Sequence, residues 1–177
     1  MYQTILMDNC LLSYQLIGKG KPVVLLHGFG EDSQIWNQQI DFLQQHCLLI
    51  VPDLPGSGKS EPLKANNTSV DSISLTDYAD CIYAILAAEK IDTCLMLGHS
   101  MGGYITLAFA EKYPTNLIAF GLIHSSALAD STDKKIMRQR GIEMMEKYGA
   151  AAFLKNTLPN LFAHNFKLLH PEIVEKF

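Results

Sequence analysis

The chain has 177 residues, of which 48% are hydrophobic and 18% charged, and its formal net charge is −4. This composition predicts a globular fold and excludes a disordered chain, and the acidic balance without a Lys/Arg cluster excludes a nucleic-acid-binding protein. No apolar run is long enough to cross a membrane and the N-terminus does not resemble a signal peptide, so we expect a cytoplasmic protein without a membrane partner.

The first half of the chain begins with strands. Residues 4–21 predict two short strands joined by a turn at Asp8. Residues 22–28 form a continuous apolar run, which is typical of a strand buried on both faces of a parallel sheet. A helical pattern over residues 32–46 separates this strand from a second buried strand over residues 47–56.

Strands and helices continue to alternate in the second half. Residues 56–72 are polar and predict a loop, and residues 74–90 predict a helix that begins with a capping box. A third strand over residues 94–98, a helix over residues 101–113 and a fourth buried strand over residues 117–126 follow.

The remaining residues, 131–177, have a helical pattern with breaks near Gly149 and Pro159 and no predicted strand. Parallel strands need crossover helices, so the alternation before this region predicts a mostly parallel, doubly wound α/β sheet. Ligands of such sheets bind at the carboxyl ends of the strands.

Ser100 lies in a G-x-S-x-G pattern between Gly98 and Gly102, where the third strand meets the following helix. A turn this tight strains its central residue and leaves room only for small residues two positions away. The strain exposes the hydroxyl, and the N-terminus of the helix favours a negative charge beside it. The pattern predicts a nucleophilic serine; the alternative is a Gly-Ser turn without chemistry.

The segment His27-Gly28-Phe29-Gly30 follows the first buried strand. Attack by a serine on a carbonyl creates an oxyanion, and each backbone N–H group that binds it contributes about 3 kcal/mol. The expected donors are the N–H groups of Met101 and Phe29. We expect His27 to hold this loop by hydrogen bonding rather than to act as a base.

Residues 53–60 end in Gly-Lys-Ser, like a phosphate-binding loop. Such a loop requires glycine where this chain has Asp53, and no helical pattern begins at Ser60. ATP is therefore not expected as a ligand.

Together, residues 27–30, 53–60 and 98–103 resemble the α/β-hydrolase superfamily in order and spacing, in particular its capped, esterase-like members with a serine nucleophile. The resemblance implies that residues 1–126 are the N-terminal part of the hydrolase core and residues 127–177 part of a helical cap. It implies no metal and no cofactor. The residues it assigns are the nucleophile Ser100, the oxyanion donors Phe29 and Met101, and the supporting motif residues His27, Gly28, Gly30, Gly98, His99, Gly102 and Gly103.

The acid and base of a catalytic triad are not evident. The family places them after the serine, in the order Asp or Glu and then His. His124, at the end of a predicted strand, and Asp130, after it, are weak candidates, and we expect both to have local structural roles. The simplest expectation is a sequence truncated before the triad Asp and His, so that the 177-residue chain alone is inactive.

These features predict a serine hydrolase that acts on a carboxylic ester or related acyl compound through an acyl-enzyme. Two alternatives stay open: a cofactor-free haloperoxidase-like or C–C bond hydrolase, and a non-catalytic binding module on the same fold. The expected partner is a small ester-like molecule. The strand at residues 117–126 is also a possible site of self-association, because a truncated sheet leaves it as an apolar edge. The four cysteines, which form no C-x-x-C pair, are expected to be free thiols.

Overall fold

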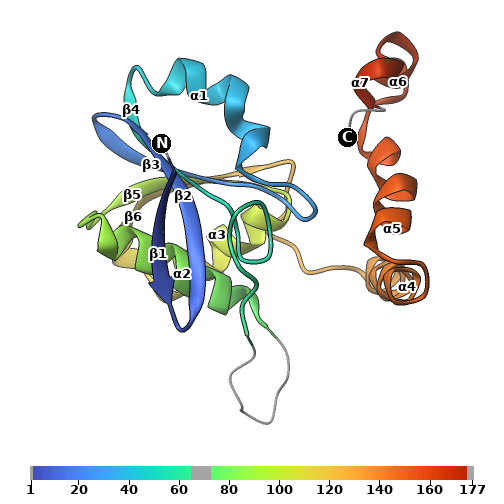
Figure 1. The fold of residues 1–177 in the computed structure, drawn as a ribbon, viewed down its shortest axis with the longest axis horizontal. Coiled ribbons are helices and arrows are strands. Elements are labelled where there is room, and N and C mark those ends of the chain that lie inside the picture. The colour runs from blue at the N-terminus through green and yellow to red at the C-terminus, as the bar shows by residue number, and fades with distance from the viewer. Residues whose placement is uncertain (1, 65–72, 175–177) are drawn as a thin grey trace. The chain divides into compact units, whose positions relative to one another are not determined.

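The computed structural model describes residues 2–64 and 73–174 (Figure 1). Residues 65–72, which belong to the loop predicted over residues 56–72, lie outside the described residues. The chain divides into two compact units, Met1–Ala127 and Leu128–Phe177. Each unit is described by itself.

The first unit is built on a six-stranded sheet with the order β1-β2-β4-β3-β5-β6. Pairs β1–β2 and β2–β4 are antiparallel, whereas β4–β3, β3–β5 and β5–β6 are parallel. The mostly parallel sheet predicted from the alternating pattern is therefore confirmed. Its strands are β1 (Tyr2–Met7), β2 (Cys10–Gly18), β3 (Lys21–Leu26), β4 (Cys47–Pro52), β5 (Cys94–His99) and β6 (Leu117–Ile123).

Helices cover both faces of this sheet (Figure 1). On one face, α2 (Leu75–Ala88) and α3 (Met101–Lys112) pack over a core that contains the fully buried Phe109. On the other face, the 3₁₀ turn η1 (Ser33–Trp36) and helix α1 (Asn37–Leu43) cover a second core that contains Trp36. The strands in the middle of the sheet are apolar on both sides because both of their faces are covered.

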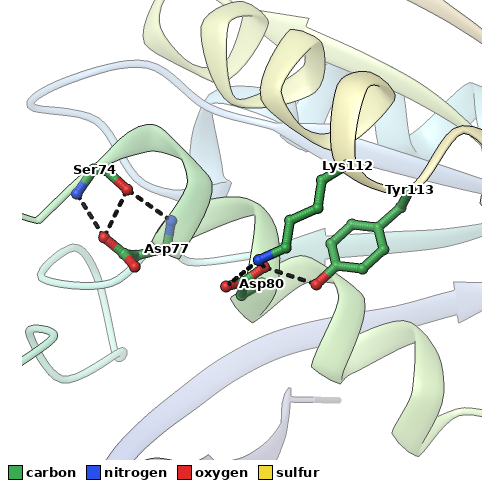
Figure 2. A network of polar contacts seen from close by, with 5 residues as sticks. All are labelled: Ser74, Asp77, Asp80, Lys112 and Tyr113. Carbon is green, nitrogen blue, oxygen red and sulfur yellow. Dashed lines mark hydrogen bonds and ion pairs between the residues drawn. The ribbon is translucent and has the colours of Figure 1, made fainter.

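Polar contacts position α2, as Figure 2 shows. Ser74 and Asp77 form the predicted capping box at its N-terminus. Farther along, Asp80 accepts hydrogen bonds from Lys112 Nζ at 2.6 Å and from Tyr113 Oη at 2.7 Å, which join α2 to the end of α3. Because α3 begins directly after Ser100, these contacts help to set the direction of the helix that follows this serine.

Strand β6 is not buried on both faces as its apolar run alone predicts, but it forms the apolar edge that is expected where no further strand follows. It pairs with β5 alone and forms an edge of the sheet among the described residues. No residue of β6 is buried, and Ile118 and Phe120 are 50% and 47% exposed. A continuous apolar run is buried on both faces only where other elements cover the strand, and a residue at a sheet edge is buried only where another element covers it.

The second unit is helical, as predicted, with no strand among its described residues. The helices break where expected: Gly149 adopts φ +84°, and Pro159 lies in a short 3₁₀ turn. No helix in the described part of the chain is both long and apolar enough to cross a membrane. The elements are α4 (Thr132–Tyr148), α5 (Ala150–Thr157), η3 (Leu158–Leu161), α6 (His164–Leu169) and α7 (Pro171–Val174).

Candidate active site

Ser100 is the single residue between β5 and α3, with φ +51° and ψ −114°. This backbone conformation is strained for a residue with a side chain. Two hydrogen bonds maintain it from the side of β6: Ser100 N–H donates to the Ile123 carbonyl at 3.0 Å, and Ser125 Oγ donates to the Ser100 carbonyl at 2.8 Å. The serine therefore lies at a rigid strand-to-helix turn, and it is only partly buried.

The glycines around Ser100 leave no room for side chains. A Cβ atom added at Gly98 would lie 2.3 Å from the Gly102 carbonyl oxygen. One added at Gly102 would lie 2.6 Å from the His27 carbonyl oxygen. One added at Gly103 would lie 2.3 Å from Ser125 Oγ. Helix α3 thus starts in close contact with β5 and β3, and its first N–H groups, including that of Met101, have no acceptor within the helix.

The loop after β3 lies beside this turn. A Cβ atom added at Gly28 would lie 3.0 Å from Ser100 Cβ, so the two backbones approach closely. Phe29 and Gly30 follow in the same loop, and the side chain of Phe29 is 55% exposed. The structure therefore brings the predicted oxyanion loop and the predicted nucleophile together.

His27 is fully buried, and both of its ring nitrogens are bonded. Nδ1 lies 2.8 Å from the Gly28 carbonyl oxygen, which can only accept, and Nε2 lies 2.9 Å from the Leu54 N–H, which can only donate. The ring is therefore neutral with its proton on Nδ1. Burial lowers the pKa of His27, although the Gly28 bond and nearby carboxylates act in the opposite direction. This residue holds the loop, as the sequence predicts, because neither nitrogen is available to a substrate.

Asp53 holds a second loop in place. Its buried carboxylate accepts the N–H groups of Ser33 and Lys59, each at 2.9 Å. A Cβ atom added at Gly58 would lie 2.4 Å from the Asp53 carboxyl carbon, so the loop closes tightly around this side chain. A carboxylate thus occupies the inside of the segment that ends like a phosphate-binding loop, which agrees with the rejection of ATP as a ligand.

Glu31 is a residue that the sequence analysis did not single out. Its Oε2 atom accepts hydrogen bonds from Gly28 N–H at 2.7 Å and from His99 Nδ1 at 2.9 Å. Burial opposes ionisation of this carboxyl, but the bonds from His99 and Gly28 outweigh burial and lower its pKa. Glu31 and His99 are 68 residues apart in the chain, so no local pattern could reveal the pair. Ser125 was missed for the same reason.

The candidates for base and acid have other neighbours. His124 directly follows β6 with φ +46°, and its ring meets that of His99 edge-on with 6.1 Å between centroids. Asp130 pairs with Arg138 within the second unit, and this bond lowers its pKa. Within residues 2–64 and 73–174, no side chain hydrogen-bonds the Ser100 hydroxyl, and no group of three or more His, Cys, Asp and Glu side chains could hold a metal ion. All four cysteines are free thiols.

Comparison with known proteins identifies the family of this chain. Residues 21–158 match the family model of the alpha/beta hydrolase fold. A pimeloyl-[acyl-carrier protein] methyl ester esterase of Proteus mirabilis is 33% identical over 116 residues, which are 65% of this chain and 41% of that protein. A putative carbamate hydrolase, RutD, of Serratia proteamaculans is 24% identical over 167 residues, 92% of this chain and 60% of that protein.

A solved structure extends the match to the three-dimensional fold. The thermophilic esterase of Thermogutta terrifontis superposes with a TM-score of 0.85 at 29% identity, over 99% of this chain and 64% of that one. The chain thus spans less than two thirds of the length of each of these relatives. It is also 31% identical over 102 residues to the uncharacterized Mycobacterium tuberculosis protein Rv2715, and this match spans 28% of that protein's length. The matched family model, the sheet order and the turn at Ser100 lead to one conclusion: the chain belongs to the α/β-hydrolase fold family.

Proposed function

We propose that the protein is a serine hydrolase that cleaves a carboxylic ester or related acyl compound, with Ser100 as the nucleophile. The observation that carries this proposal is the strained conformation of Ser100, φ +51°, at the N-terminus of α3 and beside the glycine-rich loop after β3. Strain at a single position persists only where the surrounding structure enforces it, and such positions cluster at functional sites.

The chemistry follows from what surrounds the serine. Ser100 Oγ attacks the carbonyl carbon of the ester, the carbonyl oxygen becomes an oxyanion, and the N–H groups of Met101 and Phe29 stabilise it. The alcohol leaves with the proton that the serine gives up, and water then hydrolyses the acyl-enzyme. The printed names of the relatives, an esterase and a putative carbamate hydrolase, support acyl chemistry of this kind.

Among the residues that the structure describes, no side chain is hydrogen-bonded to the Ser100 hydroxyl as a proton acceptor. His27 uses both nitrogens in structural bonds, and His99 Nδ1 is bound to Glu31. We therefore assign the acid and base of the triad to a part of the protein outside these 177 residues. This assignment is supported by the length of the relatives, because the chain matches only 60% of the RutD relative and 41% of the methyl ester esterase.

The test is hydrolysis of p-nitrophenyl acetate by the 177-residue chain and by a longer version from the same gene, each beside its Ser100→Ala variant. The longer version should show turnover that Ser100→Ala abolishes. The short chain should not exceed its own Ser100→Ala blank, because loss of the serine–histidine couple costs on the order of 10⁶ in kcat.

Two results would contradict the proposal. Ser100-dependent turnover by the short chain at the rate of the longer version would mean that a histidine of this sequence is the base, and His124→Ala would be the next variant. Negligible rates for both versions would instead favour a binding module on this fold.

A further inference from the structure

Glu31 contacts two segments that must meet for the proposed reaction. One of its hydrogen bonds holds Gly28, in the loop after β3, and the other holds His99, the last residue of β5 and the one directly before Ser100. A single carboxylate oxygen, Oε2, accepts both bonds. Because an ionised carboxylate can only accept, His99 must carry a proton on Nδ1.

The orientation of Gly28 is held from both sides. Glu31 accepts its N–H, and the His27 ring donates to its carbonyl oxygen at 2.8 Å. A trans peptide group is planar with its C=O and N–H pointing in opposite directions. The Gly28 carbonyl therefore directs the next N–H, that of Phe29, away from the His27 ring. Both peptide groups that flank the Gly28 Cα are held, one by Glu31 and one by His27.

The position of Gly28 relative to the serine is equally restricted. A Cβ atom at this position would lie 2.8 Å from Glu31 Oε2, 3.0 Å from Ser100 Cβ and 3.2 Å from His99 Nδ1. The space between the loop and Ser100 has no room for a side chain at this position, and the two bonds of Glu31 limit how far the loop can move away. Charge-assisted bonds of this length are roughly twice as strong as neutral ones, so this restraint is a strong one.

We propose that Glu31 is a positioning residue: by joining the His27–Gly30 loop to His99, it holds the Phe29 N–H at a constant distance from Ser100. This inference rests on the proposed function, because it assigns the role of Glu31 to the oxyanion site of that reaction. Glu31 itself does not need to touch the substrate.

The first test follows the Gly28 amide by NMR in the 177-residue chain and needs no catalytic activity. Glu31→Ala should move the Gly28 amide proton upfield and speed its exchange with solvent by about tenfold or more, because a charged acceptor is lost. Glu31→Gln, which keeps a neutral acceptor, should give an intermediate result. The matched control is Glu61→Ala, since Glu61 Oε2 accepts the Leu11 N–H at 3.0 Å in another part of the sheet. It should alter the Leu11 amide and leave Gly28 unchanged.

The second test measures how fast a fluorophosphonate probe labels Ser100 in the longer version of the protein. The serine oxygen forms a bond to phosphorus while the phosphorus–fluorine bond breaks and hydrogen fluoride is released, and the phosphoryl oxygen takes the place of the oxyanion. Glu31→Ala should slow labelling about tenfold or more, because displacement of a catalytic group by about 1 Å costs on the order of 10² in rate. Glu61→Ala should leave it within twofold.

An unchanged Gly28 amide in Glu31→Ala would overturn the inference, and so would a changed amide with labelling of Ser100 at the wild-type rate. Failure of the proposed function has a different signature. Wild type and Ser100→Ala would then be labelled equally, while the Gly28 amide in the short chain would still report whether Glu31 holds the loop.

Discussion

Gly98→Ala tests the claim that close backbone contact builds the turn at Ser100. The added methyl carbon would lie 2.3 Å from the Gly102 carbonyl oxygen and 2.4 Å from the Gly102 carbonyl carbon. Unstrained carbon contacts are about 3.5 Å or more, so β5 and α3 would have to separate by roughly 1 Å. Both contacts are to backbone, and no rotation of a side chain can relieve them.

We expect Gly98→Ala to destabilise the first unit by about 3 kcal/mol, at the upper end of the usual range for overpacking. This loss corresponds to a fall in Tm of about 10 °C. The probe is the fluorescence of Trp36, the single tryptophan of the chain, which is buried in the first unit. It follows unfolding of that unit separately from the helices after Ala127.

The control for this experiment is Gly121→Ala in β6, where the added methyl would meet only Leu97 Cδ2, the end of a flexible side chain, at 2.8 Å. We expect a change within about 1 kcal/mol, because Leu97 can move and alanine restricts the unfolded chain. Equal effects of the two variants, or a Gly98→Ala protein as stable as wild type, would refute the reasoning.

Three further predictions concern other parts of the first unit. The His27 ring should stay neutral below the ordinary histidine pKa of about 6.5, which ¹⁵N NMR of the ring measures. Because the pKa of His27 is lowered in the folded state, its contribution to stability is complete above pH ~6.5 and is lost as the pH falls towards the folded pKa. Half-titration of the ring at pH ~6.5 or above would contradict the assignment. Asp53→Ala should cost about 3 kcal/mol in urea unfolding, because the buried Ser33 N–H and the partly buried Lys59 N–H lose their acceptor. Asp77→Ala, which removes the carboxylate that accepts the exposed Ser74 N–H in the capping box, should cost about 1 kcal/mol; equal costs would contradict the role of Asp53 as a buried link. The 177-residue chain should self-associate through the exposed edge β6, and Phe120→Lys should shift it towards monomer in sedimentation velocity; a wild-type monomer at high concentration would disprove this.

Much of the fold could be predicted from the sequence because the signals are local. Continuous apolar runs such as residues 22–28 identify strands with two covered faces, and the capping box at Ser74 identifies the start of a helix. The turn at Ser100 could also be predicted, since Gly98 and Gly102 lie within two residues of the position that they make possible. In each case the residues that determine the structure are neighbours in the chain.

Only the tertiary structure could decide the features that depend on distant residues. Glu31 has the sequence signature of any surface acid, and its contact with His99 exists because β3 and β5 are adjacent in the sheet. The apolar run of β6 indicates a strand but does not by itself show whether both faces are covered, since exposure depends on what lies beside a strand and not on its own residues. Sequence pattern determines which elements form, because propensity and periodicity act over a few residues. The packing of those elements decides which side chains meet, because contacts between segments far apart in the chain arise only when the sheet brings them together.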